Sequence, residues 1–539
     1  MAYIAPDTTI KILKNVPLDP TYDHTIYFAN ANDQYAYFAS KVKGTNYTFS
    51  RQSYQRVNRG WLKIACAADN LYDCNYLMFQ NSAFGTKWFY AFIKTVEYVN
   101  DETTQIEYEI DDIQTWFFDY ELEQCFVERE HVSDDTIGKH TVPEQIELGE
   151  YVVTDKGLSA YFENSVSNAW SIVIVATVTV SGTTITPAAG RLLGAVYTGL
   201  AYNVFSNYSD ANTFINTVTQ DFAYGEDAIL AIFMIPQAFV TRALGSDYRQ
   251  PFTEVISKDT NWTYNIGGIA TTPKNNKLYT YPYNLLSVSN NEGNNAIFRY
   301  EFFADTSCRF GIRCALSSSP ESELIPLNYN GDVLNYNERL SISSFPLCTY
   351  ITDAYKAWLA LNSTKQTVNA VSAGMGLGAD LIKIAQAVGT AGVAQSAPLI
   401  GEAIHTNFDR IANVVVPQTI AKTMPPHAKG QSTQMLNMAV GNFGYRYYNL
   451  HVRDEYAKLI DDYFSMFGYA SHEVKVPNRN VRAYWTYTKT VGCVIKGSIP
   501  ADSARKICSI YDNGITFWRY SANIDNNIGN YSLNNAISV

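Results

Sequence analysis

The sequence predicts a mainly β protein of several domains, with a smaller share of α-helix. Its 539 residues are enough for two to four domains. It contains 40 tyrosines, and Tyr, Thr, Val and Phe all favour strands. The hydrophobic fraction of 47% is typical of a globular chain. Residues 366–424 depart from this composition, because Ala and Gly dominate them and aromatic residues almost vanish.

Residues 1–150 alternate between strand-like runs and polar turns. Apolar side chains recur at every second position of residues 88–92, and a polar turn at 99–104 follows. Residues 105–113 then alternate again, which predicts a hairpin with one buried and one acidic face. The apolar side of this second strand comprises Ile106, Tyr108 and Ile110, and the acidic side comprises Glu107, Glu109 and Asp111.

The acidic residues between 101 and 135 allow two interpretations. Paired carboxylates can perform acid–base chemistry or bind calcium. Alternation along a strand explains the same residues as a solvated face, and we favour that interpretation.

Residues 151–350 are predicted to form a middle β domain. Residues 170–180 form a continuous apolar run typical of a buried strand. Residues 228–236 form another, which Pro236 ends. Pro and Asn punctuate residues 261–284, which predicts loops and short strands.

The periodicity changes at Thr352, which can cap a helix that leads into the Ala/Gly-rich segment. Residues 384–401 carry no charge and are long enough to suggest a membrane span. Their five strongly apolar residues contribute only roughly −1.5 to −3 kcal/mol, which one central charge would cancel. We therefore predict no autonomous transmembrane helix. Either the segment is a small-residue hairpin buried in a soluble core, or it enters lipid as part of an assembly.

Residues 441–539 are predicted to be α+β. Apolar residues recur at helical spacing from 456 to 467, and Gly468 is a plausible end of that helix. Three strand-like runs, a short helix from Asp502 and a turn at 512–514 follow. The apolar stripe of this helix is expected to belong to the core rather than to a partner site, and it comprises Tyr456, Leu459, Ile460, Tyr463, Phe464 and Phe467.

Composition and motifs argue against several classes of protein. A formal net charge of −11 argues against a general nucleic-acid binder, although DNA could pass an acidic wall without sticking. The eight cysteines form no C-x-x-C pair and suit free thiols in a reducing cytoplasm, and the N-terminus lacks a secretory signal.

Residues 374–379 fit a dinucleotide-binding pattern nominally, but no strong strand precedes them. Zinc-protease, hydrolase and phosphate-loop motifs are missing, and the seven histidines are scattered. We therefore predict no catalytic residue, metal site or cofactor, and no enzyme.

Several short phrases of the sequence occur in an order that is familiar from one known family. They are residues 78–81 with Gly85, 87–92, 110–111, 114–116, 129–132, 512–516 with Trp518, and 528–532 with Asn534. Together they resemble the tail knob (distal tail tube) proteins of short-tailed, phi29-like bacteriophages. Any one phrase would be weak evidence, but the ordered set covers nearly the whole N- and C-terminal blocks. Residues 151–350 match poorly, with 281–283 the only similar phrase.

The resemblance implies a ring-forming, β-rich subunit of a homohexameric tube through which DNA and internal proteins leave the virion. It implies that an apolar loop plugs the distal end and inserts into the host cytoplasmic membrane on infection. The implied partners are the upper- and lower-collar connector proteins, the tail-tip proteins and DNA that passes without sequence-specific binding. The implied location is the virion tail, assembled in the host cytoplasm. The expected domains are 1–150 in the tube wall, 151–350 in the middle, 351–440 as helix plus plug loop, and 441–539 packed with the N-terminal domain.

Within this resemblance, individual residues receive expected roles. Six copies of the loop would act as one multivalent unit. Asp380 and Lys383 are three residues apart and could pair on a helix. The acidic residues Glu107, Glu109 and Asp111 are a candidate lining of the lumen. The residues expected to reach lipid are Met375, Leu377, Leu381, Ile382, Ile384, Val388, Val393, Leu399 and Ile400.

Two other classes remain as alternatives. A receptor- or wall-binding module at the tail tip would suit large Tyr- and Trp-rich β surfaces. A wall-degrading enzyme is the third possibility, against which the missing catalytic motifs argue.

Overall fold

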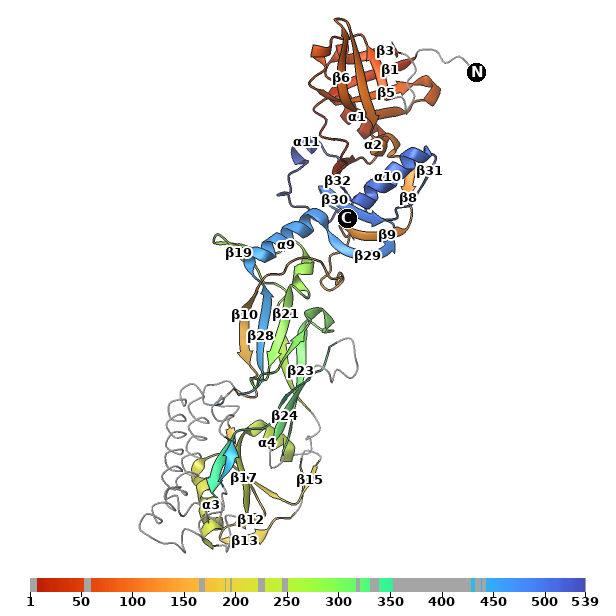
Figure 1. Ribbon diagram of the computed structural model, residues 1–539. Coiled ribbons are helices and arrows are strands. Elements are labelled where there is room, and N and C mark those ends of the chain that lie inside the picture. Colours follow the sequence, from red (N-terminus) through yellow and green to blue (C-terminus); the bar gives the residue numbers. More distant parts are fainter. Residues whose placement is uncertain are drawn as a thin grey trace, which may run out of the picture. The chain divides into compact units, whose positions relative to one another are not determined.

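The computed structural model confirms a mainly β protein and divides into two compact units (Figure 1). Unit 1 contains Met1–Gly149, Thr263–Leu278 and Asp454–Val539, and unit 2 contains Glu150–Trp262 and Tyr279–Arg453. The residues that the structure describes are 7–52, 60–163, 170–189, 191–193, 196–221, 228–244, 251–316, 320–329, 339–351, 428–431, 438 and 443–538.

This division differs in two places from the boundaries expected from the sequence. Residues 263–278, expected in the middle domain, belong to unit 1. Residues 443–453, expected in the C-terminal segment, belong to unit 2. The reason for the second difference is strand pairing, because β28 (Arg446–Val452) lies between β10 (Tyr151–Leu158) and β21 (Asn284–Ser289) in one sheet.

A six-stranded antiparallel sheet forms the first part of unit 1. Its central strands are apolar on both faces, because one core packs on Phe79 and Phe89 and a second on Tyr76 and Tyr90. The helix α1 (Ala31–Ser40) contributes to the second core. The spatial order is β3 (Thr48–Gln52), β1 (Thr8–Lys14), β5 (Cys74–Asn81), β6 (Trp88–Asn100), β7 (Thr103–Ile110) and β4 (Trp61–Ile64).

The predicted hairpin is confirmed as β6 and β7, whose register runs from Ala91 opposite Ile110 to Asn100 opposite Thr103. The burial alternates along β7, with the apolar side chains buried and Glu107 and Glu109 partly exposed. Because β6 is buried on both faces in its first half, its apolar residues do not alternate as the sequence suggested.

The second sheet of unit 1 joins the two ends of the chain. Its strands β2 and β9 come from the first 150 residues, and the other three come from the last 80. The strands β2 and β32 are parallel, and the other neighbours are antiparallel. The spatial order is β2 (His24–Tyr27), β32 (Ile515–Arg519), β30 (Trp485–Val491), β9 (Cys125–Glu130) and β29 (Tyr469–Lys475).

The helix predicted around residues 456–467 is confirmed as α9 (Asp454–Phe467). Gly468 ends it at φ +67°, where a Cβ atom would lie 2.1 Å from the carbonyl oxygen of Glu130. The prediction of Leu459 as core is wrong, since this side chain is 65% exposed. The buried stripe instead runs through Ala457, Ile460, Asp461 and Phe464.

Short elements complete unit 1. The turn predicted at 512–514 is the end of a helix, because α10 continues to Asn513 and Gly514 ends it at φ +93°. The remaining described elements are α2 (Asp112–Trp116), α10 (Ala501–Asn513), α11 (Ile524–Asn527), η1 (Thr45–Tyr47), η2 (Ala68–Asn70), η3 (Ser82–Phe84), and the strand pairs β8 (Tyr120–Leu122) with β31 (Ile495–Gly497) and β19 (Tyr264–Ile266) with β20 (Ile269–Thr271).

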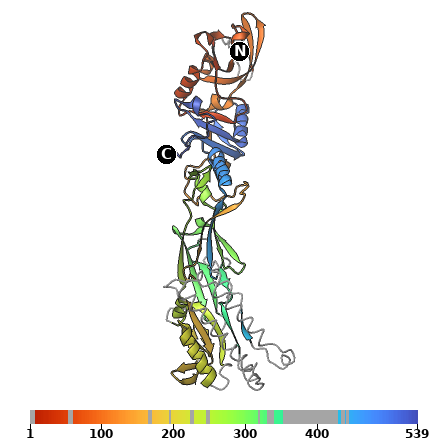
Figure 2. The same cartoon turned by 90° about the vertical axis from the view of Figure 1, so that its left-hand side faces the viewer.

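The first sheet of unit 2 contains the two continuous apolar runs predicted as strands. All seven residues of β11 are buried, and β17 pairs with it in register. The helices α3 (Tyr208–Asp221) and α4 (Gln237–Leu244) pack against this sheet (Figure 2). The spatial order is β16 (Ala201–Phe205), β11 (Trp170–Ala176), β17 (Ile229–Pro236), β26 (Leu347–Ile351) and β27 (Ala428–Gln431).

Two further four-stranded antiparallel sheets share one apolar core with this first sheet. One has the order β10, β28, β21 and β22 (Asn295–Phe298). The other has the order β18 (Phe252–Ser257), β23 (Ser307–Ala315), β24 (Glu321–Pro326) and β25 (Leu340–Ile342). The remaining described elements of unit 2 are η5 (Tyr300–Phe302), and the strand pairs β12 (Val178–Ser181) with β13 (Thr184–Pro187) and β14 (Arg191–Leu193) with β15 (Val196–Thr198). The short helix η4 (Asn276–Tyr279) begins in unit 1 and ends at the first residue of the second segment of unit 2.

Candidate functional site: the loop root and the buried carboxylates

The segment expected to plug a tube and reach lipid lies outside the described residues. This applies to the helix predicted from Thr352, the glycine-rich residues 374–379, the Asp380–Lys383 pair and all nine apolar residues between 375 and 400. The structure does describe the two strands that border the segment. The strand β26 ends at Ile351, and β27 begins at Ala428.

These two strands form the root of the loop. They pair antiparallel, with Ile351 opposite Ala428 and Tyr350 opposite Lys429. The chain therefore leaves and re-enters the sheet at neighbouring backbone positions. The strand β26 also pairs with β17, where Leu347 lies opposite the fully buried Phe233. A long insertion here costs the sheet little, because each doubling of loop length adds only about 0.6 kcal/mol of closure entropy.

The acidic face of β7 is less uniform than the alternation predicts. Glu109 lies 2.7 Å from Nζ of Lys94 and 3.1 Å from Nζ of Lys506. Hydrogen bonding to Lys94 is the largest effect that lowers the pKa of Glu109, and Lys506 adds to it. Glu107 accepts a hydrogen bond from Thr95 and stays partly exposed.

The prediction that Asp111 shares this exposed face is wrong. Its side chain is 1% exposed, so it cannot line a lumen. One carboxylate oxygen accepts the backbone N–H of Gln114 and caps α2, and the other accepts the hydroxyl of Tyr76 at 2.9 Å. Burial raises the pKa of Asp111 to about 7.

A cavity of about 310 Å³ opens beside the same strand. Four of its charged side chains pair with one another, since Lys94 and Lys506 contact Glu109 and Lys506 also contacts Asp112 at 3.5 Å. These pairs join α10 to the β6–β7 hairpin. The lining residues are Gly60, Lys94, Tyr108, Glu109, Ile110, Asp112, Asp502, Ser503 and Lys506.

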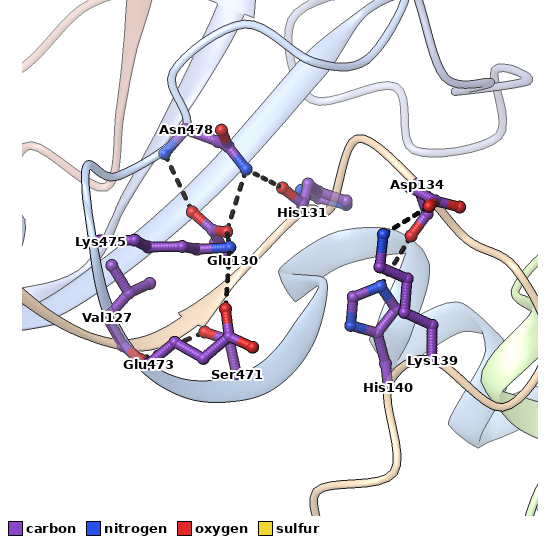
Figure 3. A network of polar contacts seen from close by, with 10 residues as sticks. All are labelled: Val127, Glu130, His131, Asp134, Lys139, His140, Ser471, Glu473, Lys475 and Asn478. Carbon is purple, nitrogen blue, oxygen red and sulfur yellow. Dashed lines mark hydrogen bonds and ion pairs between the residues drawn. The ribbon is translucent and has the colours of Figure 1, made fainter.

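The matching phrase 129–132 lies in a network of polar contacts in which Glu130 meets Lys475 and Asn478 (Figure 3). Glu130 is 0% exposed and lies 2.5 Å from Nζ of Lys475. Asn478 donates to it twice, from its backbone N–H and from its side-chain amide, both at 2.9 Å. Burial nevertheless raises the pKa of Glu130, because desolvation outweighs these contacts.

His131 is a buried, neutral imidazole. Its Nδ1 accepts the backbone N–H of Tyr487 at 2.8 Å, so Nε2 carries the proton and donates to the carbonyl of Ser465 at 3.1 Å. Burial, followed by the nearby charge of Arg482, lowers its pKa to about 3. This environment fits a satisfied core histidine, as the scattered histidines of the sequence suggested.

Glu144 is a second buried carboxylate of unit 1, and no sequence pattern indicated it. Its side chain is fully buried between Arg129 and Lys277, and Nζ of Lys277 lies 2.5 Å away. The backbone N–H of Ala470 donates to it at 2.9 Å. These groups come from three distant parts of the sequence, and a local motif cannot reveal such a site.

Asp461 on α9 is the third such carboxylate. It accepts the backbone N–H groups of Lys274 and Asn275 and the hydroxyl of Tyr264. Together Glu144 and Asp461 hold residues 263–278 against α9 and β29 within unit 1. We call Glu130, Glu144 and Asp461 the buried carboxylates.

The described residues offer little for metal chemistry. Their His, Cys, Asp and Glu side chains form no group of three or more placed to hold a metal ion. No helix in the described ranges is long and apolar enough to cross a bilayer. The cysteines whose side chains are described, all free thiols, are Cys66, Cys74, Cys125, Cys308, Cys314, Cys493 and Cys508.

Comparison with known proteins gives a consistent result. Residues 246–536 match the family model of the C-terminal domain of the Bacillus phage phi29 tail knob protein gp9. Residues 6–121 match the model of the caudoviral major tail protein N-terminus. The chain is similar over its full length, and over theirs, to the tail knob proteins gp9 of Bacillus phages PZA and phi29, at 27% and 26% identity.

A solved structure shows the same fold. The tail knob protein gp12 of bacteriophage C1 superposes with a TM-score of 0.60 over 98% of this chain and 100% of that one. The identity is only 12%, so this likeness concerns the fold. The family resemblance inferred from the ordered phrases is confirmed.

Proposed function

Because the chain belongs to the family of phi29 gp9 tail knob proteins, and is therefore a structural protein of a phage tail that contacts other tail proteins, we propose that it forms the distal tail tube of a short-tailed phage. Six copies enclose a channel for DNA ejection, and residues 366–424 plug the channel before inserting into the host cytoplasmic membrane. The tail is assembled in the host cytoplasm on the collar connector, and tail-tip proteins join it. The protein acts without a catalytic site, metal or cofactor.

The observation that carries this proposal is the root of the loop. A segment that plugs a channel and is later released must change its position without unfolding the wall. The pairing of Ile351 with Ala428 fixes both ends of residues 352–427 at one side of the sheet that contains the buried strands β11 and β17. Movement of the loop therefore leaves the pairing of β11 and β17 unaffected.

Charge supports the passage of DNA. The net charge of −11 repels phosphate, so a wall built from this chain would let DNA slide without specific binding. Glu107 and Glu109 remain our proposed lumen residues, and Asp111 does not, because its carboxylate is buried.

Leakage of a dye from liposomes tests the role of the loop. We expect the double variant Ile384→Asp and Val388→Asp to lose leakage at least tenfold relative to the wild type. Two Asp residues at the bilayer centre cost roughly 5–7 kcal/mol together, which exceeds the whole apolar gain of roughly 1.5–3 kcal/mol of residues 384–401. Gel filtration should show an unchanged assembly state, since both positions lie beyond the root.

A matched control separates this effect from added charge. Val255 and Ile269 are exposed apolar residues, 57% and 71% exposed, that lie outside the loop. Val255→Asp with Ile269→Asp adds the same charge and should leave leakage unchanged. Leakage by the Ile384 and Val388 variant at the wild-type rate would contradict the insertion of this segment into lipid.

A further inference from the structure

Glu130 joins a lysine and an asparagine through a single carboxylate oxygen. Its Oε1 lies 2.5 Å from Nζ of Lys475 and accepts the side-chain amide N–H of Asn478 at 2.9 Å. The two nitrogens are therefore no farther apart than these two contacts laid end to end. Figure 3 shows both side chains reaching the carboxylate. A lysine amine, an asparagine amide and a buried carboxyl group between them are the three parts that an intramolecular isopeptide bond requires.

We propose that Lys475 and Asn478 form a self-modification site, at which Nζ of Lys475 replaces the side-chain amide nitrogen of Asn478 and leaves an isopeptide bond. Glu130 serves this reaction first as its general base and then as its general acid. The reaction happens once in each chain and turns over no substrate, so it does not make the protein an enzyme.

The neighbouring strands hold Asn478 in place for this reaction. Its backbone N–H donates to Oε2 of Glu130 at 2.9 Å, and its carbonyl oxygen accepts the hydroxyl of Thr488 on β30. Its side-chain amide also donates to the carbonyl of His131 at 3.2 Å. The nitrogen that would leave is therefore fixed against the carboxylate that would protonate it.

The backbone brings Lys475 to the same oxygen. Lys475 is the last residue of β29, and only Val476 and the buried Pro477 separate it from Asn478. The ring of Pro477 fixes its φ angle, which limits the conformations of this short link. The lysine side chain is 32% exposed, and its Nζ also lies 3.5 Å from Glu473. It thus extends from the surface to the buried carboxylate.

The environment of Glu130 suits a group that must hold a proton. Its side chain is 0% exposed. Burial raises its pKa, and the negative charge of Glu473 acts in the same direction, although the hydrogen bonds from Lys475 and Asn478 oppose both effects. A buried carboxylate that takes the ammonium proton removes two desolvated charges at once. The lysine is then a neutral amine, which is the nucleophilic form.

The chemistry balances within the chain. The ammonium of Lys475 gives one proton to Oε1 of Glu130, and the neutral amine attacks Cγ of Asn478 to form the new C–N bond. Glu130 passes its proton to Nδ2 and takes one from the lysine nitrogen. The bond from Cγ to Nδ2 then breaks, and the nitrogen leaves as ammonia, which carries the last proton away as ammonium. The step needs no oxidant, reductant or other reagent.

The bond would lock the link between β29 and β30, the two strands on either side of β9. No local motif could reveal this site, because Glu130 comes from a position 348 residues away from Asn478. In a tube that carries DNA, which rests on the proposed function, a covalent link would keep these strands connected under mechanical load.

Mass spectrometry of the purified full-length chain, after overnight incubation, tests the proposal. The intact chain should be lighter than its sequence requires by one molecule of ammonia. Trypsin should leave residues 459–479 as one peptide with the same deficit, because a lysine in an isopeptide bond resists cleavage. A chain of full mass that trypsin cleaves after Lys475 would overturn the proposal.

Two lysine variants show which residue supplies the nucleophile. Lys475→Arg keeps a positive charge beside Glu130 but carries no amine, so its chain should have the full mass of its sequence. Lys489→Arg is the matched control, because Lys489 makes an ordinary ion pair with Glu128 at 2.8 Å, and it should keep the loss of ammonia. Loss of ammonia from the Lys475 variant would mean that Asn478 cyclises on its own backbone, which would also overturn the proposal.

A third variant tests the role of the carboxylate. Glu130→Gln keeps the size of the side chain and removes the base, so the isopeptide bond should form about a hundredfold more slowly or not at all. Circular dichroism checks that this variant is folded, and Lys475→Arg gives the same test at a partly exposed position. Bond formation at the wild-type rate in a folded Glu130 variant would refute the role of Glu130. These assays follow chemistry within one chain, so their outcome is independent of whether six copies assemble.

Discussion

Asp111 shows how a single residue can join two elements and set a pH dependence. It ends β7, caps α2 and accepts the Tyr76 hydroxyl, all while buried. Burial raises its pKa to about 7, against about 3.9 in an unfolded chain. Because the folded chain holds this proton more tightly, Asp111 stabilises the fold below about pH 4. That stabilisation is lost as the pH rises through about 7.

We expect Asp111→Asn to remove this dependence. Asparagine can cap the helix with its oxygen and donate to Tyr76 with its amide. The unfolding free energy of the wild type minus that of the variant should fall by about 1.4 kcal/mol per pH unit between about pH 4 and 7, or about 4 kcal/mol in all. Urea unfolding of both proteins across this range measures it. Parallel stability profiles would show that Asp111 ionises normally.

The sequence does indicate that Asp111 caps a helix, but the period-two pattern of the preceding strand predicts an exposed position for the same residue. Asp111 continues the acidic side of the strand, and the period of two therefore assigned it to the exposed face. The spacing of Asp111 and Gln114 is that of a capping box at the start of a helix. The rule for helix starts would have directed the carboxylate towards the backbone N–H groups of the following helix. His131 carried no comparable signal, because its two backbone partners come from residues more than 300 positions away.

At the scale of elements, the buried carboxylates hold segments that meet only in the folded chain. Glu144 lies between Arg129 of β9 and Lys277 of the segment 263–278. Removing one partner of a buried ion pair leaves an uncompensated buried charge. This lowers the free energy of unfolding far more than the loss of an ion pair at the surface does.

We therefore expect Glu144→Gln to lower the unfolding free energy of unit 1 by about 3–5 kcal/mol, as measured by urea unfolding. The matched control is Glu128→Gln, which removes a half-exposed pair with Lys489 at 2.8 Å. It should cost less than about 1 kcal/mol. Equal losses for the two variants would mean that Glu144 has no special structural role.

Local elements could be predicted from the sequence, and their pairing could not. The strands β11 and β17 follow from continuous apolar runs, and α9 follows from helical spacing. The sheet that joins β2 to β32 and β9 to β29 depends on contacts between the chain ends, which no local window contains. For the same reason residues 263–278 could not be assigned to unit 1 in advance. The environment of the plug residues stays a prediction, because they lie outside the described residues.

At the scale of the whole molecule, the family assignment and the loop root together define the proposed account. The family gives the role of a tail knob protein. The paired strands β26 and β27 give the segment 352–427 a fixed base on the sheet that contains β11 and β17. The account requires that copies of the chain form a ring, since a single chain encloses no channel.

Negative-stain electron microscopy of the purified protein, with two-dimensional averaging, tests this requirement most directly. The account predicts hollow end views with six-fold symmetry and side views of a short tube. Compact single subunits at every protein concentration and in the presence of the collar proteins would contradict it.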